Sequence, residues 1–267
     1  MKSDQFFEAL WQDYTRLTPQ AAAIQQLFRD DGNSIVNDHV AFRTFADSPI
    51  DLEKLEPHIL SLGYRYFDEY HFHEKHLRAR AYLPGESLQP RIFLSELLWT
   101  ELSGEAQTLC KTYIEQIDPN CIATSEVFWN GRLWTMPRWS EYQALLAESE
   151  YAAWLSIHGL HANHFTISVN VLKDDSLSYV NDKLQAAGYA LNTSGGLIKG
   201  TPLSLLEQSA TLADETTLTF ADGDEHVVPT CYYEFAKRYR DDSGKLYQGF
   251  VPDNANHIFH STDRQLH

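Results

Sequence analysis

Hydrophobic positions recur at helical spacing near the start of the chain and at strand spacing further on. Two helices are predicted first, and Thr18-Pro19 supplies the N-cap and first residue of the second, which Gly32 ends. From Asp38, apolar and polar residues alternate, which is the period of a strand with two different faces. The pattern predicts a βαβββ unit with a strand to about 45, a helix over 51–62, and strands near 64–72, 77–84 and 91–98.

Helical spacing returns over 103–118 and 140–158. Ser140 and Gln143 have the spacing of a capping box, so we expect one continuous helix from 140 to 158. This region predicts a helical insertion after the first βαβββ unit.

The second half of the chain repeats the first at a spacing of 125 residues (39 to 164). Asp38-His39-Val40-Ala41-Phe42 aligns with Asn163-His164-Phe165-Thr166-Ile167, and each histidine precedes a Gly-Tyr pair by the same interval. A shared strand start, apolar helix spacing and helix-ending glycine indicate a duplicated module. The second copy is predicted to contain a strand from 164, a helix over 175–187, a strand after 189, a short helix near 202–209, and strands around 215–220 and 226–238.

These elements define an α+β fold of duplicated βαβββ modules with added helices. We expect a single domain over 1–267, with modules at 36–100 and 161–240, a helical insertion at 101–160 and a C-terminal segment at 241–267.

Charge narrows the possible partners. The 267 residues include 37 acidic and 21 basic side chains, for a net charge of −16, which argues against nucleic acid and membrane surfaces and favours a small molecule. Cys110, Cys121 and Cys231 form no CxxC pair, which indicates a reducing compartment. The N-terminus lacks an apolar signal core and no long apolar stretch follows, so we expect a cytoplasmic protein.

The two aligned histidines lie on equivalent strand faces. His39 shares its face with Ala41 and Arg43, and His164 shares its face with Ser168. If these faces meet across a pseudo-twofold axis, the two imidazoles lie close together. A lone histidine is more often structural, but repetition at an equivalent position favours a functional site.

A facial-triad iron site requires two neutral imidazoles and one carboxylate. The carboxylate has two candidates, Glu234 and Glu96, because each lies in an aromatic, strand-forming run. A carboxylate in such a run is either solvated or buried with a cation. We favour Glu234, since its flanking aromatic residues predict the more enclosed strand.

Arg43 indicates a substrate. It lies four positions beyond His39 on the same face, about 13 Å along the strand, and its guanidinium suits bidentate contact with a carboxylate. The repeat predicts Ser168 opposite Arg43, so one half of the site would carry a cation and the other a small side chain. An ordinary structural ion pair is the alternative role for Arg43.

Other motifs fit less well. His158, His161 and His164 have three-residue spacing, but His164 begins a strand, which breaks a common helical face. His73 and His76 are one residue short of the HExxH spacing. GxSxG, P-loop and GxGxxG motifs do not occur in the sequence, which disfavours hydrolases, NTPases and dinucleotide-dependent enzymes.

Three segments resemble motifs of the 2-oxoadipate dioxygenase/decarboxylase family: Asp-His39-Val-Ala-Phe-Arg43-Thr, Ala-Asn-His164-Phe-Thr and Tyr-Tyr-Glu234-Phe-Ala-Lys-Arg. The resemblance covers most of the chain. It implies a vicinal oxygen chelate-like half-open barrel, which agrees with the repeat. It also implies iron(II) ligands at His39, His164 and Glu234, a catalytic, substrate-binding arginine at Arg43, and a C-terminal segment that lines the pocket with Asn254 as a contact.

The resemblance implies an activity that converts 2-oxoadipate, an intermediate of lysine breakdown, to 2-hydroxyglutarate with Fe²⁺ and dioxygen. Characterised family members are considerably longer, so this chain would be a compact form. Two other functions stay open on the sequence. One is a metal-dependent isomerase or lyase that uses the same triad without oxygen, and the other is a protein that sequesters a ligand between its modules.

Overall fold

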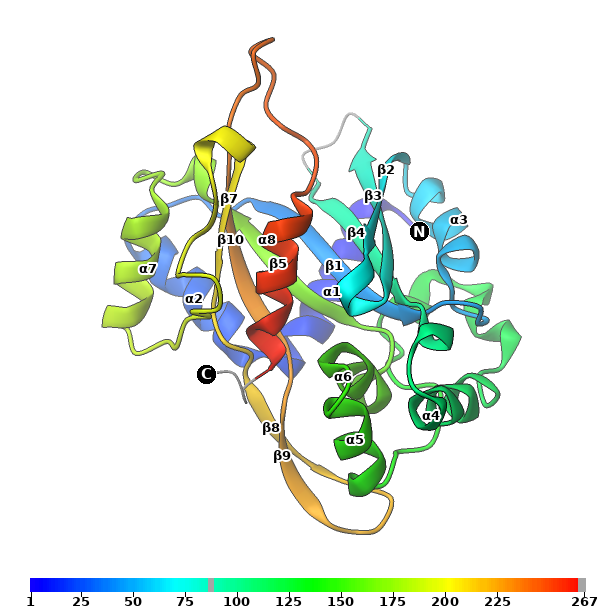
Figure 1. Ribbon diagram of the computed structural model, residues 1–267. Coiled ribbons are helices and arrows are strands. Elements are labelled where there is room, and N and C mark those ends of the chain that lie inside the picture. Colours follow the sequence, from blue (N-terminus) through cyan, green and yellow to red (C-terminus); the bar gives the residue numbers. More distant parts are fainter. Residues whose placement is uncertain (86–88, 264–267) are drawn as a thin grey trace.

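One curled sheet organises the molecule (Figure 1). The computed structural model describes residues 1–85 and 89–263. Its main sheet has eight strands in the order β2-β3-β4-β1-β5-β10-β7-β6. These strands are β1 (Asn37–Phe45), β2 (Tyr64–Phe72), β3 (Leu77–Pro84), β4 (Arg91–Leu97), β5 (Ala162–Ser168), β6 (Lys199–Thr201), β7 (Leu206–Ala210) and β10 (Tyr232–Arg238).

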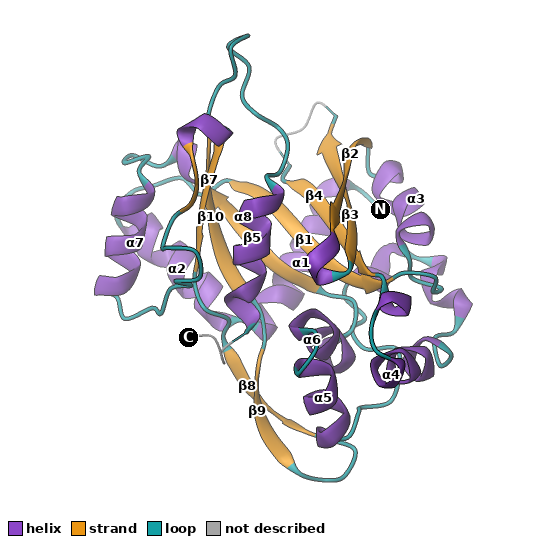
Figure 2. Ribbon diagram, viewed as in Figure 1, coloured by secondary structure: helices purple, strands orange, loops and turns teal. Residues whose placement is uncertain are grey.

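Helices cover both faces of this sheet (Figure 2). They are α1 (Ser3–Leu17), α2 (Pro19–Asp30), α3 (Leu52–Ser61), α4 (Gly104–Ile114), α5 (Trp139–Leu146), α6 (Glu150–His158), α7 (Leu177–Ala186) and α8 (Pro252–Ile258). Among the described residues, no helix has both the length and the apolar character needed to span a membrane.

The strand order confirms the duplicated module. In each half, the first strand pairs in parallel with the last, β1 with β4 and β5 with β10, and the two halves join through the antiparallel pair β1 and β5. The other strands follow outward in equivalent order, which gives the sheet an approximate twofold relation. The domain boundaries that we expected from the sequence stay a prediction, and residues 264–267 of the expected C-terminal segment lie outside the described residues.

The predicted helix over 140–158 is wrong, because it is two helices, α5 and α6. The first ends at Leu146, and Ser149 caps the second, since its hydroxyl accepts a hydrogen bond from the Ala152 N–H at 3.2 Å. The first turn of α5 is closed by Glu141, which accepts from the Arg138 N–H at 2.8 Å, instead of by Ser140 and Gln143.

The second module also differs from its predicted elements. The expected helix over 202–209 is only the short turn Pro202–Ser204, after which Leu205 adopts a left-handed conformation and β7 begins. The expected strand over 226–238 is two strands in different sheets. Pro229 ends β9 (Glu225–Pro229), which pairs with β8 (Glu215–Thr219) in a separate hairpin, and β10 then returns to the main sheet.

The sheet has a convex and a concave face. Val40 and Phe42 of β1 point to the convex side with Phe165 of β5, where α1, α3 and α7 pack on the strands. On the concave side, α8 contacts β2, β6 and β7. Because β2 and β6 are the two edges of the sheet, these contacts show that the sheet curls around α8 as a half-barrel.

We expect Phe42→Ala to lower the free energy of unfolding by about 3–5 kcal/mol, because the ring is fully buried and packs against Phe128 at 5.0 Å between centroids. Chemical denaturation measures this change. The control is Leu203→Ala, since Leu203 is 95% exposed and its truncation leaves the stability nearly unchanged. Equal effects of the two substitutions would contradict this assignment of the core.

Candidate metal centre

Three neighbouring strands bring the predicted ligands together on the concave face. His39 on β1, His164 on β5 and Glu234 on β10 place one ligand atom each within 4.8 Å of one another, and all three residues are buried. The imidazole centroids lie 5.4 Å apart. His39 Nε2 lies 3.5 Å from one carboxylate oxygen of Glu234, and His164 Nε2 lies 3.3 Å from the other. Among the described residues, no other group of three such side chains converges in this way.

The chemistry of this cluster fits a divalent cation. Burial raises the pKa of Glu234 and holds the pKa of His164 well below its ordinary value. Glu234 Oε2 is buried and has no hydrogen-bond partner among the described residues. A neutral imidazole offers a lone pair at Nε2, which in His39 lies 3.0 Å from Thr166 Oγ1. A cation between these atoms would take one ligand from each histidine and satisfy the orphaned oxygen.

A charged network holds the first histidine. His39 Nδ1 lies 2.8 Å from a carboxylate oxygen of Asp38. Arg238 donates to both oxygens of Asp38 at 2.8 Å, and Arg91 donates to one of them at 3.1 Å. Although burial alone would raise the pKa of Asp38, these two guanidinium groups hold it well below its ordinary value. The carboxylate therefore fixes the imidazole with Nε2 facing the cluster.

The second histidine and the glutamate have neutral supports. His164 Nδ1 lies 3.2 Å from the side-chain oxygen of Asn163, the residue that aligns with Asp38 in the repeat. Gln208 donates to Glu234 Oε1 at 2.7 Å, and the amide of Asn254 donates to Gln208 Oε1 at 3.1 Å. The predicted contact residue Asn254 is therefore joined to the triad through Gln208, and its contact with a substrate stays a prediction.

Two other predicted residues lie away from the triad. Glu96 pairs with Thr44 on the convex face, where it accepts hydrogen bonds from Arg78 at 2.7 Å and from the N-terminus of α3. Glu96 is therefore not a member of the cluster. The expectation that Ser168 lies opposite Arg43 is wrong, because β1 and β5 are antiparallel and equivalent residues beyond the histidines diverge to opposite ends of the pair.

Arg43 lies on the concave face beyond Ala41, as its spacing predicts. Its guanidinium is buried and forms a 2.9 Å ion pair with Glu150 at the start of α6. The remaining histidines of the three-residue series bind elsewhere, since His158 contacts the carbonyl of Pro229 and His161 contacts Asp13. The three histidines of that series therefore do not converge on one point.

Sequence reasoning missed several supporting residues. Asp38 and Asn163 carried a readable signal, because a polar residue precedes the histidine in both copies of the repeat. Gln208 carried none, since it lies in a segment that was predicted to be helical. Phe250 was also missed, and its ring lies 4.9 Å from the His39 imidazole, where it closes one side of the cluster.

Paired βαβββ halves define a vicinal oxygen chelate-like fold, and a buried His-His-Glu cluster at their junction forms a candidate metal centre. The family model described as 2-oxoadipate dioxygenase/decarboxylase matches residues 6–241. This chain belongs to that family, as the sequence motifs predicted.

Individual relatives are similar to this chain over most of its length. The 2-oxoadipate dioxygenase/decarboxylase of Oryza sativa subsp. japonica is 35% identical over 97% of this chain and 79% of its own length. The crystal structure of the Oryza sativa hydroxyglutarate synthase in complex with 2-oxoadipate is 33% identical, with a TM-score of 0.87 over 98% of this chain and 93% of that one. A Shewanella frigidimarina protein, provisionally described as a hydrolase, is 44% identical, with a TM-score of 0.88 over 93% of this chain and 97% of that one.

We expect the protein to bind about one equivalent of a divalent metal ion, and His39→Ala and Glu234→Ala each to abolish that binding, because each removes one of three ligands. Metal analysis after loading and desalting measures the stoichiometry. His71→Ala is the control, since His71 is exposed on β2. Retention of the metal by both triad variants would contradict the site.

Gln208→Leu should lower the metal affinity about 10- to 100-fold, because Glu234 then loses the amide that orients its carboxylate. A competition titration with a chelator measures the affinity. Gln185→Leu, on the exposed side of α7, serves as the matched control. An unchanged affinity in the Gln208 variant would show that Glu234 needs no such support.

Proposed function

We propose that this chain is a non-haem iron(II)-dependent dioxygenase and decarboxylase that converts 2-oxoadipate and O₂ to 2-hydroxyglutarate and CO₂. The buried cluster of His39, His164 and Glu234, in a member of this family, is the observation that carries the proposal. The conversion balances, because both oxygen atoms of O₂ enter 2-hydroxyglutarate, one in the carboxylate formed at the former 2-oxo carbon and one in the new hydroxyl group. The released CO₂ carries the oxygen atoms of the original carboxylate.

The three ligands suit this chemistry. Iron(II), when bound, would supply open coordination positions for the 2-oxo acid group and for dioxygen. Two neutral imidazoles and one carboxylate leave a divalent ion with about one net positive charge, which favours an anionic 2-oxo acid. Asp38 and Gln208 keep the ligand atoms of His39 and Glu234 directed at one point, so the site is organised before the substrate arrives.

Arg43 is the proposed partner of the distal carboxylate. Ala41 lies between His39 and Arg43 on the same face, and its small side chain leaves room for the carbon chain of the substrate. Phe93 pairs with Ala41 from β4, and Phe250 packs on Phe93 at 4.6 Å between ring centroids. These rings exclude water from the space between the cluster and the guanidinium, which strengthens a charge-assisted contact there.

The proposal includes the cytoplasmic location that the sequence predicts. Cys110, Cys121 and Cys231 are all free thiols in the structure, which supports a reducing compartment such as the cytoplasm. In that compartment the reaction would be a step of lysine breakdown, as the family resemblance implies.

Oxygen consumption tests the proposed function. With the iron(II)-loaded protein and 2-oxoadipate, we expect O₂ uptake and CO₂ release in a 1:1 ratio and accumulation of 2-hydroxyglutarate. His164→Ala should consume no oxygen. Turnover under strict anaerobiosis with Ni²⁺, Zn²⁺ or Mn²⁺ would contradict an oxygenase and would support the isomerase or lyase alternative.

Arg43→Lys should lower kcat/KM for 2-oxoadipate about 10- to 100-fold, because lysine keeps the charge that neutralises Glu150 but loses the bidentate fork. For 2-oxohexanoate, which lacks the distal carboxylate, we expect a change of less than about threefold. Steady-state oxygen uptake with both acids measures the two effects. An equal loss for both acids would argue that Arg43 acts without contacting the distal carboxylate.

A further inference from the structure

Arg43, the proposed substrate-binding arginine, already holds a carboxylate of the protein. Its Nη1 donates to Glu150 Oε2 at 2.9 Å, and its Nη2 donates to Thr262 Oγ1 at 3.1 Å. The hydroxyl of Thr262 in turn donates to the same Glu150 oxygen at 2.7 Å. Three distant parts of the chain therefore meet at this point: β1, the first turn of α6 and the turn that follows α8.

This contact is incompletely satisfied. Arg43 Nε and Glu150 Oε1 are buried and have no hydrogen-bond partners among the described residues. The guanidinium also lies 4.7 Å above the ring of Tyr151 and 5.1 Å from that of Trp154, so it is held in an aromatic enclosure that suits a planar cation. Because one N–H of the guanidinium is unused in the described part of the chain, Arg43 can bind a different carboxylate that accepts more hydrogen bonds from it than Glu150 does.

The segment 252–262 covers the triad. The cavity beside His39, His164 and Glu234 measures only about 20 Å³, roughly the space of one water molecule. Its outer wall is formed by the segment 252–262, through Ala255, Ile258 and Phe259. A six-carbon acid therefore requires this segment to move away from the triad.

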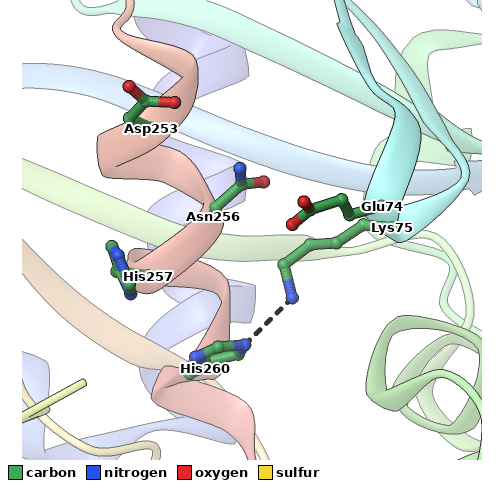
Figure 3. A pocket seen from close by; sticks show the side chains of 6 residues that line it. All are labelled: Glu74, Lys75, Asp253, Asn256, His257 and His260. Carbon is green, nitrogen blue, oxygen red and sulfur yellow. Dashed lines mark hydrogen bonds between the residues drawn. The ribbon is translucent and has the colours of Figure 1, made fainter. Parts of the chain in front are cut away.

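Several contacts fasten this segment to the rest of the molecule, and two of them lie near Arg43. Others join it to Asn192, Gln208 and Ala213 and stay in place when the two near Arg43 break. Of those two, one is Thr262, through Arg43 and Glu150. The other is His260, whose Nε2 lies 3.1 Å from Lys75 Nζ on the turn between β2 and β3 (Figure 3). Lys75, Glu150 and His260 line one shared hollow of about 280 Å³. The ammonium group of Lys75 therefore lines the hollow that the Glu150 carboxylate would enter on leaving Arg43.

We propose that Glu150 is a specificity-determining residue that occupies Arg43 until a 2-oxo dicarboxylic acid replaces it. Glu150 then passes to Lys75, and the exchange releases the segment 252–262 at both Thr262 and His260. This inference rests on the proposed function, because it takes the distal carboxylate of the substrate as the replacing group. The exchange breaks one ion pair, Arg43 with Glu150, and forms two, Arg43 with the substrate and Glu150 with Lys75.

The exchange distinguishes substrates by charge. A dicarboxylic acid supplies a new anion for Arg43, so neither Arg43 nor Glu150 is left buried and unpaired. A monocarboxylic acid of equal length cannot do this, and breaking the pair then leaves an uncompensated charge at Arg43. Glu150 thus keeps the site closed to acids that lack the second carboxylate.

Glu150→Gln tests the proposal in the iron(II)-loaded protein by oxygen uptake. A neutral amide competes poorly for Arg43, so we expect KM for 2-oxoadipate to fall about tenfold. KM for 2-oxohexanoate should fall as well, because this acid then breaks no ion pair on entering. Glu105→Gln is the matched control, because Glu105 also lies in the first turn of a helix but is exposed. A higher KM for 2-oxoadipate in the Glu150 variant would overturn the proposal, since Glu150 would then be positioning Arg43 for the substrate.

Thr262→Val provides a second test that leaves all charges in place. It removes one fastening of the segment, so amide hydrogen exchange over 252–262 should become faster, and KM for 2-oxoadipate should fall. Unchanged exchange in this variant would overturn the release of the segment. Wild-type protein that neither consumes oxygen nor makes 2-hydroxyglutarate with 2-oxoadipate would contradict the proposed function, and this inference with it. Normal wild-type turnover, with a higher KM in the Glu150 variant or unchanged hydrogen exchange in the Thr262 variant, would contradict the inference alone.

Discussion

The antiparallel pairing of β1 with β5 is the constraint on which the site depends. Its register sets Ala41 opposite His164 and His39 opposite Thr166, so the two histidines lie on one face as diagonal neighbours. A slip of one residue would turn one imidazole to the convex side, among the aromatic side chains under α1. The parallel pairing of β10 with β5 then sets Glu234 beside Thr166 and completes the cluster. Duplication supplies the histidines, and the junction of the copies supplies their proximity.

Electrostatics explains why the cluster calls for a cation. Elsewhere in the buried interior, carboxylates have cationic partners: Asp38 has Arg238 and Arg91, and Glu150 has Arg43. Glu234 receives hydrogen bonding only from a neutral amide, beside two imidazoles, and one of its oxygens is unpartnered among the described residues. A buried carboxylate in these surroundings is costly unless a positive charge joins it. The net charge of −16 therefore says little about the site, where positive charge is concentrated at Arg43 and at the proposed iron.

The sequence predicted the parts that local patterns encode. Alternation, helix caps and the repeat predicted the first module closely and identified both histidines; the flanking aromatic residues and the family motif favoured Glu234 over Glu96. Ser168 was misplaced because alignment of a repeat gives equivalence and says nothing of strand direction. The contact of Arg43 with Glu150 and Thr262 was out of reach, since it joins segments more than a hundred residues apart that have no common pattern. Asn254 was expected at the substrate, whereas the structure joins it to the triad through Gln208.

The central claim is that the paired halves of the sheet build one iron centre from these three side chains. Anomalous diffraction at the iron absorption edge, on crystals of the iron(II)-loaded protein, tests it most directly. We expect one strong peak within about 2.0–2.2 Å of His39 Nε2, His164 Nε2 and an oxygen of Glu234. A peak at His257 and His260 on the C-terminal segment, with none at the triad, would contradict it.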